Sequence, residues 1–123
     1  MHRIKLIAAV ETWPLREPFV IARGVKTEAH VVVATITDGR VSGHGECVPY
    51  ARYGETVDGV LAAIEGLAQK TDVAIGRSNL AEHLSPGAAR NAVDCALWDY
   101  EAKASGTRAH TRAGLPSPGP CTT

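Results

Sequence analysis

The chain has 123 residues, and its thirteen basic side chains are balanced by thirteen acidic ones. This length accommodates one domain with its own core, but not a complete (β/α)₈ barrel, which needs at least about 200 residues. The balanced charge argues against nucleic acid and anionic membranes as partners, and no apolar run reaches the roughly 18 residues of a membrane span. Three widely spaced cysteines, Cys47, Cys95 and Cys121, predict free thiols and a cytoplasmic protein.

Three segments in the first half of the chain predict β-strands: residues 3–13 and 29–37, which are rich in branched apolar side chains, and residues 40–47, which return after a turn. We interpret the first of them as a strand and not as a signal peptide. Residues 14–28, with two prolines and a glycine, predict a loop. Asp38-Gly39 is typical of a hairpin turn, so the sequence predicts a three-stranded antiparallel meander.

Helical periodicity begins after the strands. Apolar side chains spaced from Val57 to Leu67 predict an amphipathic helix with Thr56 as its N-cap. Glu55, just before that cap, suits the positive end of the helix dipole and needs only a structural role. Residues 71–85 predict a looser segment that contains a short helix around residues 80–84.

The strongest helix is predicted to start with Ser85 as N-cap and Pro86 at its first position, and to end at Gly106. Its charged residues at i, i+4 spacing, Arg90 with Asp94 and Asp99 with Lys103, favour a solvated face over contact with a second domain. Strands followed by helices predict an α+β fold: a three-stranded antiparallel meander followed by a helical bundle. We expect one domain over residues 1–105 and a linker-like tail over residues 106–123, which contains a Gly- and Pro-rich run.

Gly43-His44-Gly45-Glu46 resembles two motifs and completes neither of them. It lacks the third glycine of a dinucleotide fingerprint, so we expect its glycines to permit close strand packing or a bulge. Its His-x-Glu matches zinc deaminases, but the required Pro-Cys-x-x-Cys is absent. The sequence therefore predicts neither a phosphate site nor a metal site.

Two segments carry candidate recognition residues. Arg23 and Lys26 flank a glycine in the first predicted loop, where two cations can receive a carboxylate, although an ordinary solvated loop explains them equally well. Tyr50, Arg52 and Tyr53 lie between the third strand and the first helix. A loop held between two rigid elements is a plausible place to bind a small charged substrate.

Three sequence blocks carry a resemblance to a known family: WPLREPFVIARG (13–24), GHGECVPYARYGE (43–55) and GAARNAVDCALWD (87–99). The chain resembles the N-terminal capping domain of the enolase superfamily, in the muconate-lactonizing-enzyme subgroup. Within that subgroup it is most similar to bacterial L-Ala-D/L-Glu (dipeptide) epimerases. The resemblance extends from the first strand to about residue 105.

The resemblance implies a two-domain isomerase of murein peptide metabolism, in which this domain caps a catalytic barrel. The barrel abstracts the proton α to a carboxylate, with Mg²⁺ stabilising the enediolate and lysines exchanging the proton. Residues 13–28 and 48–55 would be the two loops that close over a dipeptide. Arg23 and Lys26 would then bind substrate charge, and Tyr50, Arg52 and Tyr53 would serve lid closure.

The chain departs from this family because the barrel is absent. No Asp or Glu follows Glu101 and no Lys follows Lys103, so the metal-binding carboxylates and catalytic lysines are missing. We expect a chain truncated before the barrel, with no catalytic residue, no bound Mg²⁺ and no activity alone. The alternatives are the cap of another superfamily member (a cycloisomerase or a different racemase) and a non-catalytic remnant or binding module. An exposed barrel-docking face would then predict self-association.

Overall fold

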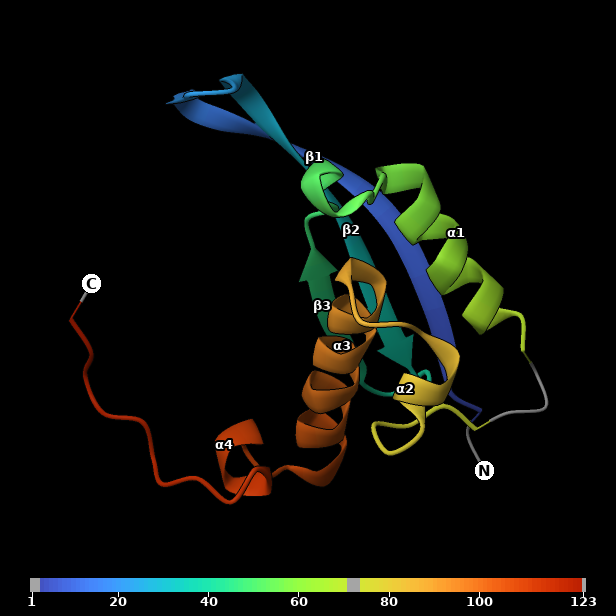
Figure 1. Cartoon of the computed structure of the whole chain (residues 1–123). Helices are drawn as coiled ribbons and strands as arrows, with labels where there is room; N and C mark the ends of the chain where they lie inside the picture. The colour runs from blue at the N-terminus through green and yellow to red at the C-terminus, as the bar shows by residue number, and fades with distance from the viewer. Residues whose placement is uncertain (1–2, 71–73, 123) are drawn as a thin grey trace.

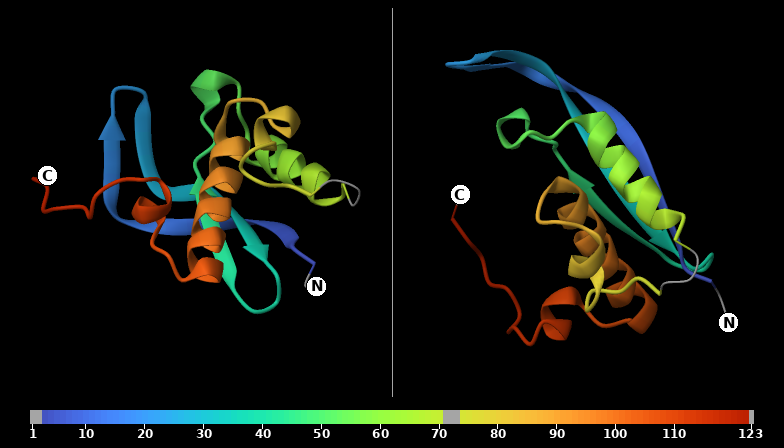
Figure 2. Two further views of the ribbon diagram at one scale, coloured as in Figure 1. Left: turned by 90° about the horizontal axis from the view of Figure 1, so that it is seen from below. Right: turned by 45° about the vertical axis from the view of Figure 1, so that its right-hand side comes forward.

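The computed structural model describes residues 3–70 and 74–122. It contains strands β1 (Lys5–Ile21), β2 (Gly24–Thr37) and β3 (Ser42–Cys47), and helices η1 (Ala51–Tyr53), α1 (Val57–Ala68), α2 (Leu80–His83), α3 (Ala88–Ser105) and α4 (Ala109–Arg112). The strands form one antiparallel sheet in the order β1-β2-β3, with α1 and α3 on the same face (Figures 1 and 2). The predicted α+β fold and three-stranded meander are confirmed.

The hairpin between β2 and β3 has the predicted turn. The backbone amides of Arg40 and Val41 both donate to Asp38 Oδ1, at 2.8 and 3.0 Å. Gly39 adopts a φ of 89°, a conformation that disfavours side chains. The Tyr100 hydroxyl of α3 donates to Asp38 Oδ2 at 3.0 Å, so the turn is also tied to the helix layer.

The prediction of a loop at residues 14–28 is wrong, because this segment forms the end of a long β-hairpin, which we call the arm. β1 continues to Ile21, β2 begins at Gly24, and Phe19 pairs with Lys26 after a register shift that follows Pro14. Prolines normally indicate a break, but β1 is an edge strand, where alternate amides face solvent and a proline at such a position removes no hydrogen bond from the sheet. The arm extends beyond the rest of the sheet (Figure 1), and Val20 is 71% exposed.

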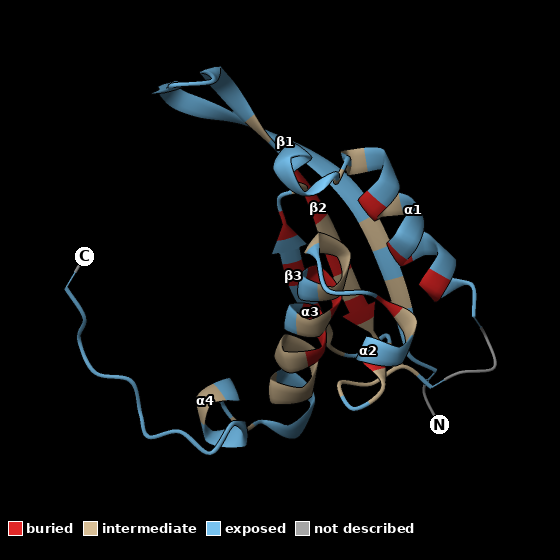
Figure 3. Ribbon diagram, in the orientation of Figure 1, coloured by how far each residue is buried: buried red, intermediate tan, exposed pale blue. Residues whose placement is uncertain are grey.

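The core lies between the sheet and the two long helices (Figure 3). Alternate residues of β2, namely Val32, Ala34 and Ile36, are buried beneath them, as period-two patterning requires. α1 contributes three buried side chains at helical spacing: Val60, Ile64 and Leu67. Thr56 caps α1 as predicted, with its Oγ1 accepting from the Gly59 amide at 3.0 Å.

α3 packs directly on the backbone of β3. A Cβ atom placed on Gly43 would lie 2.6 Å from the Tyr100 Cα, and one on Gly45 would lie 2.7 Å from the Ala96 amide nitrogen, with other backbone atoms closer still. These glycines therefore permit close packing, as the sequence predicted, although the close neighbour is a helix.

The start of α3 differs from the prediction, and its end does not. Gly87, and not Ser85, is the N-cap, and it supplies no side-chain hydrogen bond. α3 ends as predicted at Gly106, which adopts a left-handed φ of 67°. The short helix predicted around residues 80–84 is present as α2, while residues 71–73 of that segment lie outside the described residues.

The predicted tail contains one helical turn, α4, which is tied to α3. Arg112 Nη2 lies 3.6 Å from Glu101 Oε2, and Arg112 Nη1 donates to Ser105 Oγ at 3.2 Å. Residues 113–122 contain no helix or strand. The domain boundary at residue 105 stays a prediction. No helix in the described part of the chain is long and apolar enough to cross a membrane.

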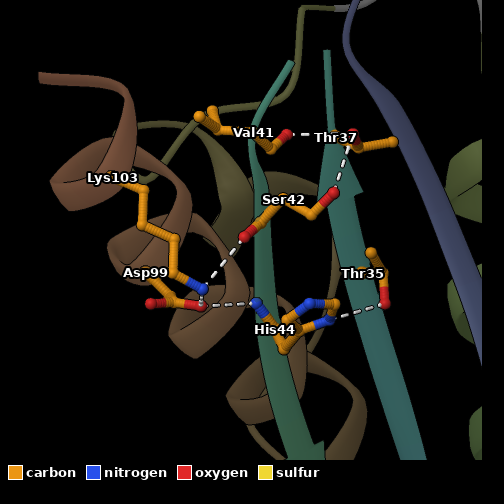
Figure 4. A network of polar contacts seen from close by, with 7 residues as sticks. All are labelled: Thr35, Thr37, Val41, Ser42, His44, Asp99 and Lys103. Carbon is orange, nitrogen blue, oxygen red and sulfur yellow. Dashed lines mark hydrogen bonds and ion pairs between the residues drawn. The ribbon is translucent and has the colours of Figure 1, made fainter. Parts of the chain in front are cut away.

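A polar network joins α3 to the outer edge of β3 (Figure 4). Asp99 Oδ2 accepts from the His44 amide at 2.8 Å and from Lys103 Nζ at 2.7 Å, and Lys103 also donates to the Ser42 carbonyl at 3.0 Å. The predicted i, i+4 pair of Asp99 and Lys103 is therefore present. The other predicted pair, Arg90 and Asp94, forms no ion pair among the described residues.

We expect Asp99→Asn to lower the free energy of unfolding by about 1 kcal/mol at neutral pH, because a partly exposed carboxylate loses charge-assisted hydrogen bonds. Partial burial alone would raise the pKa of Asp99, but the hydrogen bonds from Lys103 and His44 outweigh it and hold that pKa below its usual range. The stabilisation is therefore present above the unfolded-state pKa of roughly 4 and is lost as pH falls through the folded-state pKa.

Urea unfolding of both proteins between pH 3 and 7 measures this difference. It should shrink below about pH 4, where the wild-type carboxylate becomes protonated. Asp94→Asn is the matched control, since Asp94 lies on the same helix without an ion pair among the described residues. An equal effect of the two substitutions at neutral pH would contradict the role of the network.

Candidate substrate-recognition site

Three of the five predicted site residues come together where the hairpin arm meets the loop after β3. Lys26 Nζ, from β2, lies 5.7 Å from the centre of the Tyr50 ring. The rings of Tyr50 and Tyr53 lie 5.8 Å apart at an angle of 38°. Two segments that are separate in sequence thus present one exposed surface of two tyrosine rings and one ammonium group. We call Tyr50, Tyr53 and Lys26 the aromatic platform.

The loop after β3 is shaped by local hydrogen bonds. The Tyr53 amide donates to the Tyr50 carbonyl at 3.0 Å, which closes the single turn of η1. Side chains three residues apart on such a turn lie on the same side, so Tyr50 and Tyr53 are neighbours. Gly54 ends the turn with a left-handed φ of 73°.

The other two predicted site residues are not part of this cluster. Arg23 lies in the two-residue connection at the tip of the arm, and Arg52 lies in η1. Both are exposed, and neither makes a hydrogen bond or an ion pair with the described residues. Their charges are therefore available to a ligand.

A hollow of about 340 Å³ lies between this loop and the start of α3. It is lined by Cys47, Val48, Tyr50, Tyr53, Glu55, Gly87, Ala88 and Asn91. Burial raises the pKa of the Cys47 thiol, which contacts the Val32 carbonyl at 3.6 Å and stays protonated at neutral pH. The thiol is therefore a poor nucleophile at neutral pH.

Glu55 has a role that its sequence position does not reveal. Its place before α1 indicates an interaction with the dipole of that helix, yet its Oε2 accepts from the Ala88 amide at the start of α3, at 2.7 Å. Its Oε1 accepts from the Tyr50 amide at 3.3 Å. The signal that could have found this role is the absence of a capping side chain at Gly87, which leaves the first amides of α3 in need of an acceptor.

The described residues contain no cluster of three His, Cys, Asp or Glu side chains that could hold a metal ion. Mg²⁺ binds through carboxylates and other oxygen ligands in near-octahedral geometry. The residues described in this chain therefore do not fit a Mg²⁺ site.

The architecture defines the class of protein. The three-stranded meander with helices on one face agrees with the N-terminal domain of the enolase superfamily, and the family model of the mandelate racemase / muconate lactonizing enzyme N-terminal domain matches residues 3–111. The chain belongs to that family.

Individual relatives show which enzymes of this family the chain is similar to. The L-Ala-D/L-Glu epimerase of Escherichia coli (strain K12) is 48% identical over 93 residues, which cover 76% of this chain and 29% of the epimerase. A solved Agrobacterium tumefaciens enolase-family member, with homology to dipeptide epimerases and bound to sodium and L-Ala-L-Glu, is 50% identical with a TM-score of 0.85, covering 93% of this chain and 35% of that one.

A third match shows the metal in a relative. The dipeptide epimerase of Methylococcus capsulatus, complexed with Mg and L-Arg-D-Lys, is 29% identical with a TM-score of 0.70, covering 84% of this chain and 32% of that one. The chain therefore spans about a third of the length of the relatives it matches. The part that it matches is the N-terminal domain of the enolase-superfamily fold, and the relatives include dipeptide epimerases.

Proposed function

We propose that this chain is the capping and substrate-specificity domain of a Mg²⁺-dependent dipeptide epimerase that acts on L-Ala-D/L-Glu. The observation that carries the proposal is the aromatic platform, where two distant segments present tyrosine rings and a cation beside an open hollow. A dipeptide with an acidic side chain offers carboxylates to the cation, and L-Ala-D/L-Glu also offers its alanine methyl group to the rings. The relatives that bind dipeptides support this choice.

Each predicted residue has a distinct part in this proposal. Lys26 and Arg23 attract the substrate's carboxylates, and the exposed position of Arg23 at the arm tip lets it fold over a bound ligand. Tyr50 and Tyr53 exclude water from the ligand, and Arg52 lies beside them on η1 to complete the closed lid. These roles are recognition roles, because none of these groups forms a proton-transfer pair with another described residue.

The chemistry would come from a barrel domain. Abstraction of a proton α to a carboxylate needs strong charge stabilisation, which Mg²⁺ supplies in enzymes of this superfamily. The described residues of this chain include no cluster of His, Cys, Asp or Glu that could hold a metal ion. We therefore expect the 123-residue chain alone to catalyse no exchange of the α-proton of L-Ala-D-Glu into D₂O.

The recognition roles can be tested in a chimera in which residues 3–111 replace the N-terminal domain of the Escherichia coli epimerase. We expect Arg23→Ala and Lys26→Ala each to lower kcat/KM for L-Ala-D-Glu by about 10-fold or more, since a charge-assisted hydrogen bond contributes roughly 1.5–3 kcal/mol. Lys70→Ala, an exposed lysine just after α1, is the control and should leave kcat/KM unchanged.

Two results would count against the proposal. If both substitutions behave like Lys70→Ala, the assignment of substrate charge to this domain is wrong. If the chimera epimerises an uncharged dipeptide as efficiently as L-Ala-D-Glu, the acidic specificity is wrong. Arg52→Ala in the same chimera tests lid closure separately, with a fall in kcat/KM expected.

A further inference from the structure

α3 begins without a cap of its own. Gly87 occupies the N-cap position with φ of 155° and ψ of −171°, a region that is essentially restricted to glycine, and it has no side chain to accept the first amides. Glu55, 33 positions earlier in the chain, supplies that acceptor to the Ala88 amide. A Cβ on Gly87 would lie 3.1 Å from Glu55 Oε2, so glycine also leaves room for the carboxylate.

The same carboxylate also binds the loop after β3, which contains Tyr50 and Tyr53. Its second oxygen accepts from the Tyr50 amide at 3.3 Å, and the Glu55 amide donates to the Tyr50 carbonyl at 3.2 Å. Tyr50 is thus held through both of its backbone polar groups by a single residue. That residue is in turn held by a helix packed against the core.

Tyr50 is also the centre of the aromatic platform, since it contacts both Tyr53 and Lys26. A shift of the Tyr50 backbone would move the ring on which both neighbours lie. One carboxylate therefore connects the rigid start of α3 to the two segments that we assign to substrate recognition.

We propose that Glu55 is a positioning residue: its carboxylate joins the Tyr50 backbone to the first turn of α3 and thereby holds the aromatic platform in its substrate-binding position. This inference rests on the proposed function for its consequence, but its structural part can be tested without it. The competing explanation is that Glu55 only caps α3, with no effect on the loop.

The first test uses the 123-residue chain and amide hydrogen exchange followed by NMR. Glu55→Gln keeps the shape of the side chain but leaves one oxygen to serve two amide donors. We expect the amides of residues 50, 53 and 54 to exchange about 10-fold faster or more, while amides of β2 keep their wild-type rates. Glu65→Gln, on the exposed side of α1, is the control and should change neither set.

A milder variant keeps the test decisive if Glu55→Gln lowers overall stability. Glu55→Asp retains the negative charge near α3 but is one methylene too short to reach both amides. Faster exchange confined to residues 50–54 supports the proposal. Unchanged exchange of the loop in both variants, with a lower thermal midpoint, would show that Glu55 only caps α3 and would overturn it.

The second test is kinetic and uses the chimera. We expect Glu55→Gln to raise KM for L-Ala-D-Glu by about 10-fold with a smaller change in kcat. A loosened platform affects substrate binding directly, whereas the chemical step takes place in the barrel. An unchanged KM, with the loop shown to be loosened, would overturn the functional half of the proposal. A wild-type chimera without activity would instead refute the proposed function and leave the exchange result standing.

Discussion

Replacing Gly45 with alanine is expected to remove a large part of the stability of this domain, about 3 kcal/mol or more of the 5–15 kcal/mol that is typical of native proteins. A Cβ at this position would overlap the carbonyl oxygen of Ala92 and lie 2.7 Å from the Ala96 amide nitrogen. Both neighbours are backbone atoms of α3, so no side-chain rotation relieves the overlap. The helix would have to move away from β3 and open the core beneath it.

Urea unfolding followed by circular dichroism measures the loss, and Gly66→Ala is the matched control. Gly66 lies inside α1, where an added methyl group would have nothing within 4 Å of it, and its φ is not positive. Alanine there should raise stability by about 0.5–1 kcal/mol, because glycine is a poor helix former. Equal midpoints for the two variants would mean that α3 does not approach β3 as closely as the structure shows.

Truncating Ile64 to alanine should have the second largest effect, a loss of about 2–5 kcal/mol. Ile64 is 0% exposed and projects from the middle of α1 into the cluster formed with the sheet and α3. Removal of three methyl or methylene groups leaves a cavity that the surrounding β-branched side chains of the sheet fill poorly. The same unfolding experiment checks this value.

Two companion variants separate the cavity from general effects on α1. Ile64→Val should cost only about 0.5–1.5 kcal/mol, since one methylene is lost. Leu61→Ala removes a partly buried side chain of the same helix and should cost less than Ile64→Ala. The reverse order would show that α1 faces the sheet differently from the structure.

Much of the fold was predictable because its signals are local. Runs of branched apolar residues indicated the first two strands, Asp38-Gly39 indicated the turn that leads to the third, and Thr56 marked the start of α1. The error at residues 14–28 has a specific origin. Pro14 and Pro18 indicated a break, but an edge strand tolerates proline, and no local pattern records that β1 and β2 stay paired beyond the three-stranded part of the sheet.

The candidate site was only partly predictable. The residue types and the family resemblance indicated each of the five site residues separately. They indicated no contact among those residues. The structure brings Lys26 to Tyr50 because β2 continues into the arm, where its register against β1 shifts after Pro14, and it leaves Arg23 and Arg52 exposed. Lys26 and Tyr50 are 24 positions apart in the sequence. Whether the Lys26 side chain lies near the Tyr50 ring depends on that register, so residue types alone could not predict the contact.

The sequence by itself determined the family, the order of strands and helices, and which faces of them are apolar, because periodicity and capping depend on neighbouring residues. Only the tertiary structure decided which distant groups meet. Glu55 binds the Ala88 amide and Asp99 binds the His44 amide, although each carboxylate is locally an ordinary helix or loop residue. Buried and half-buried amides must find an acceptor, and packing decides which carboxylate is near enough to supply it.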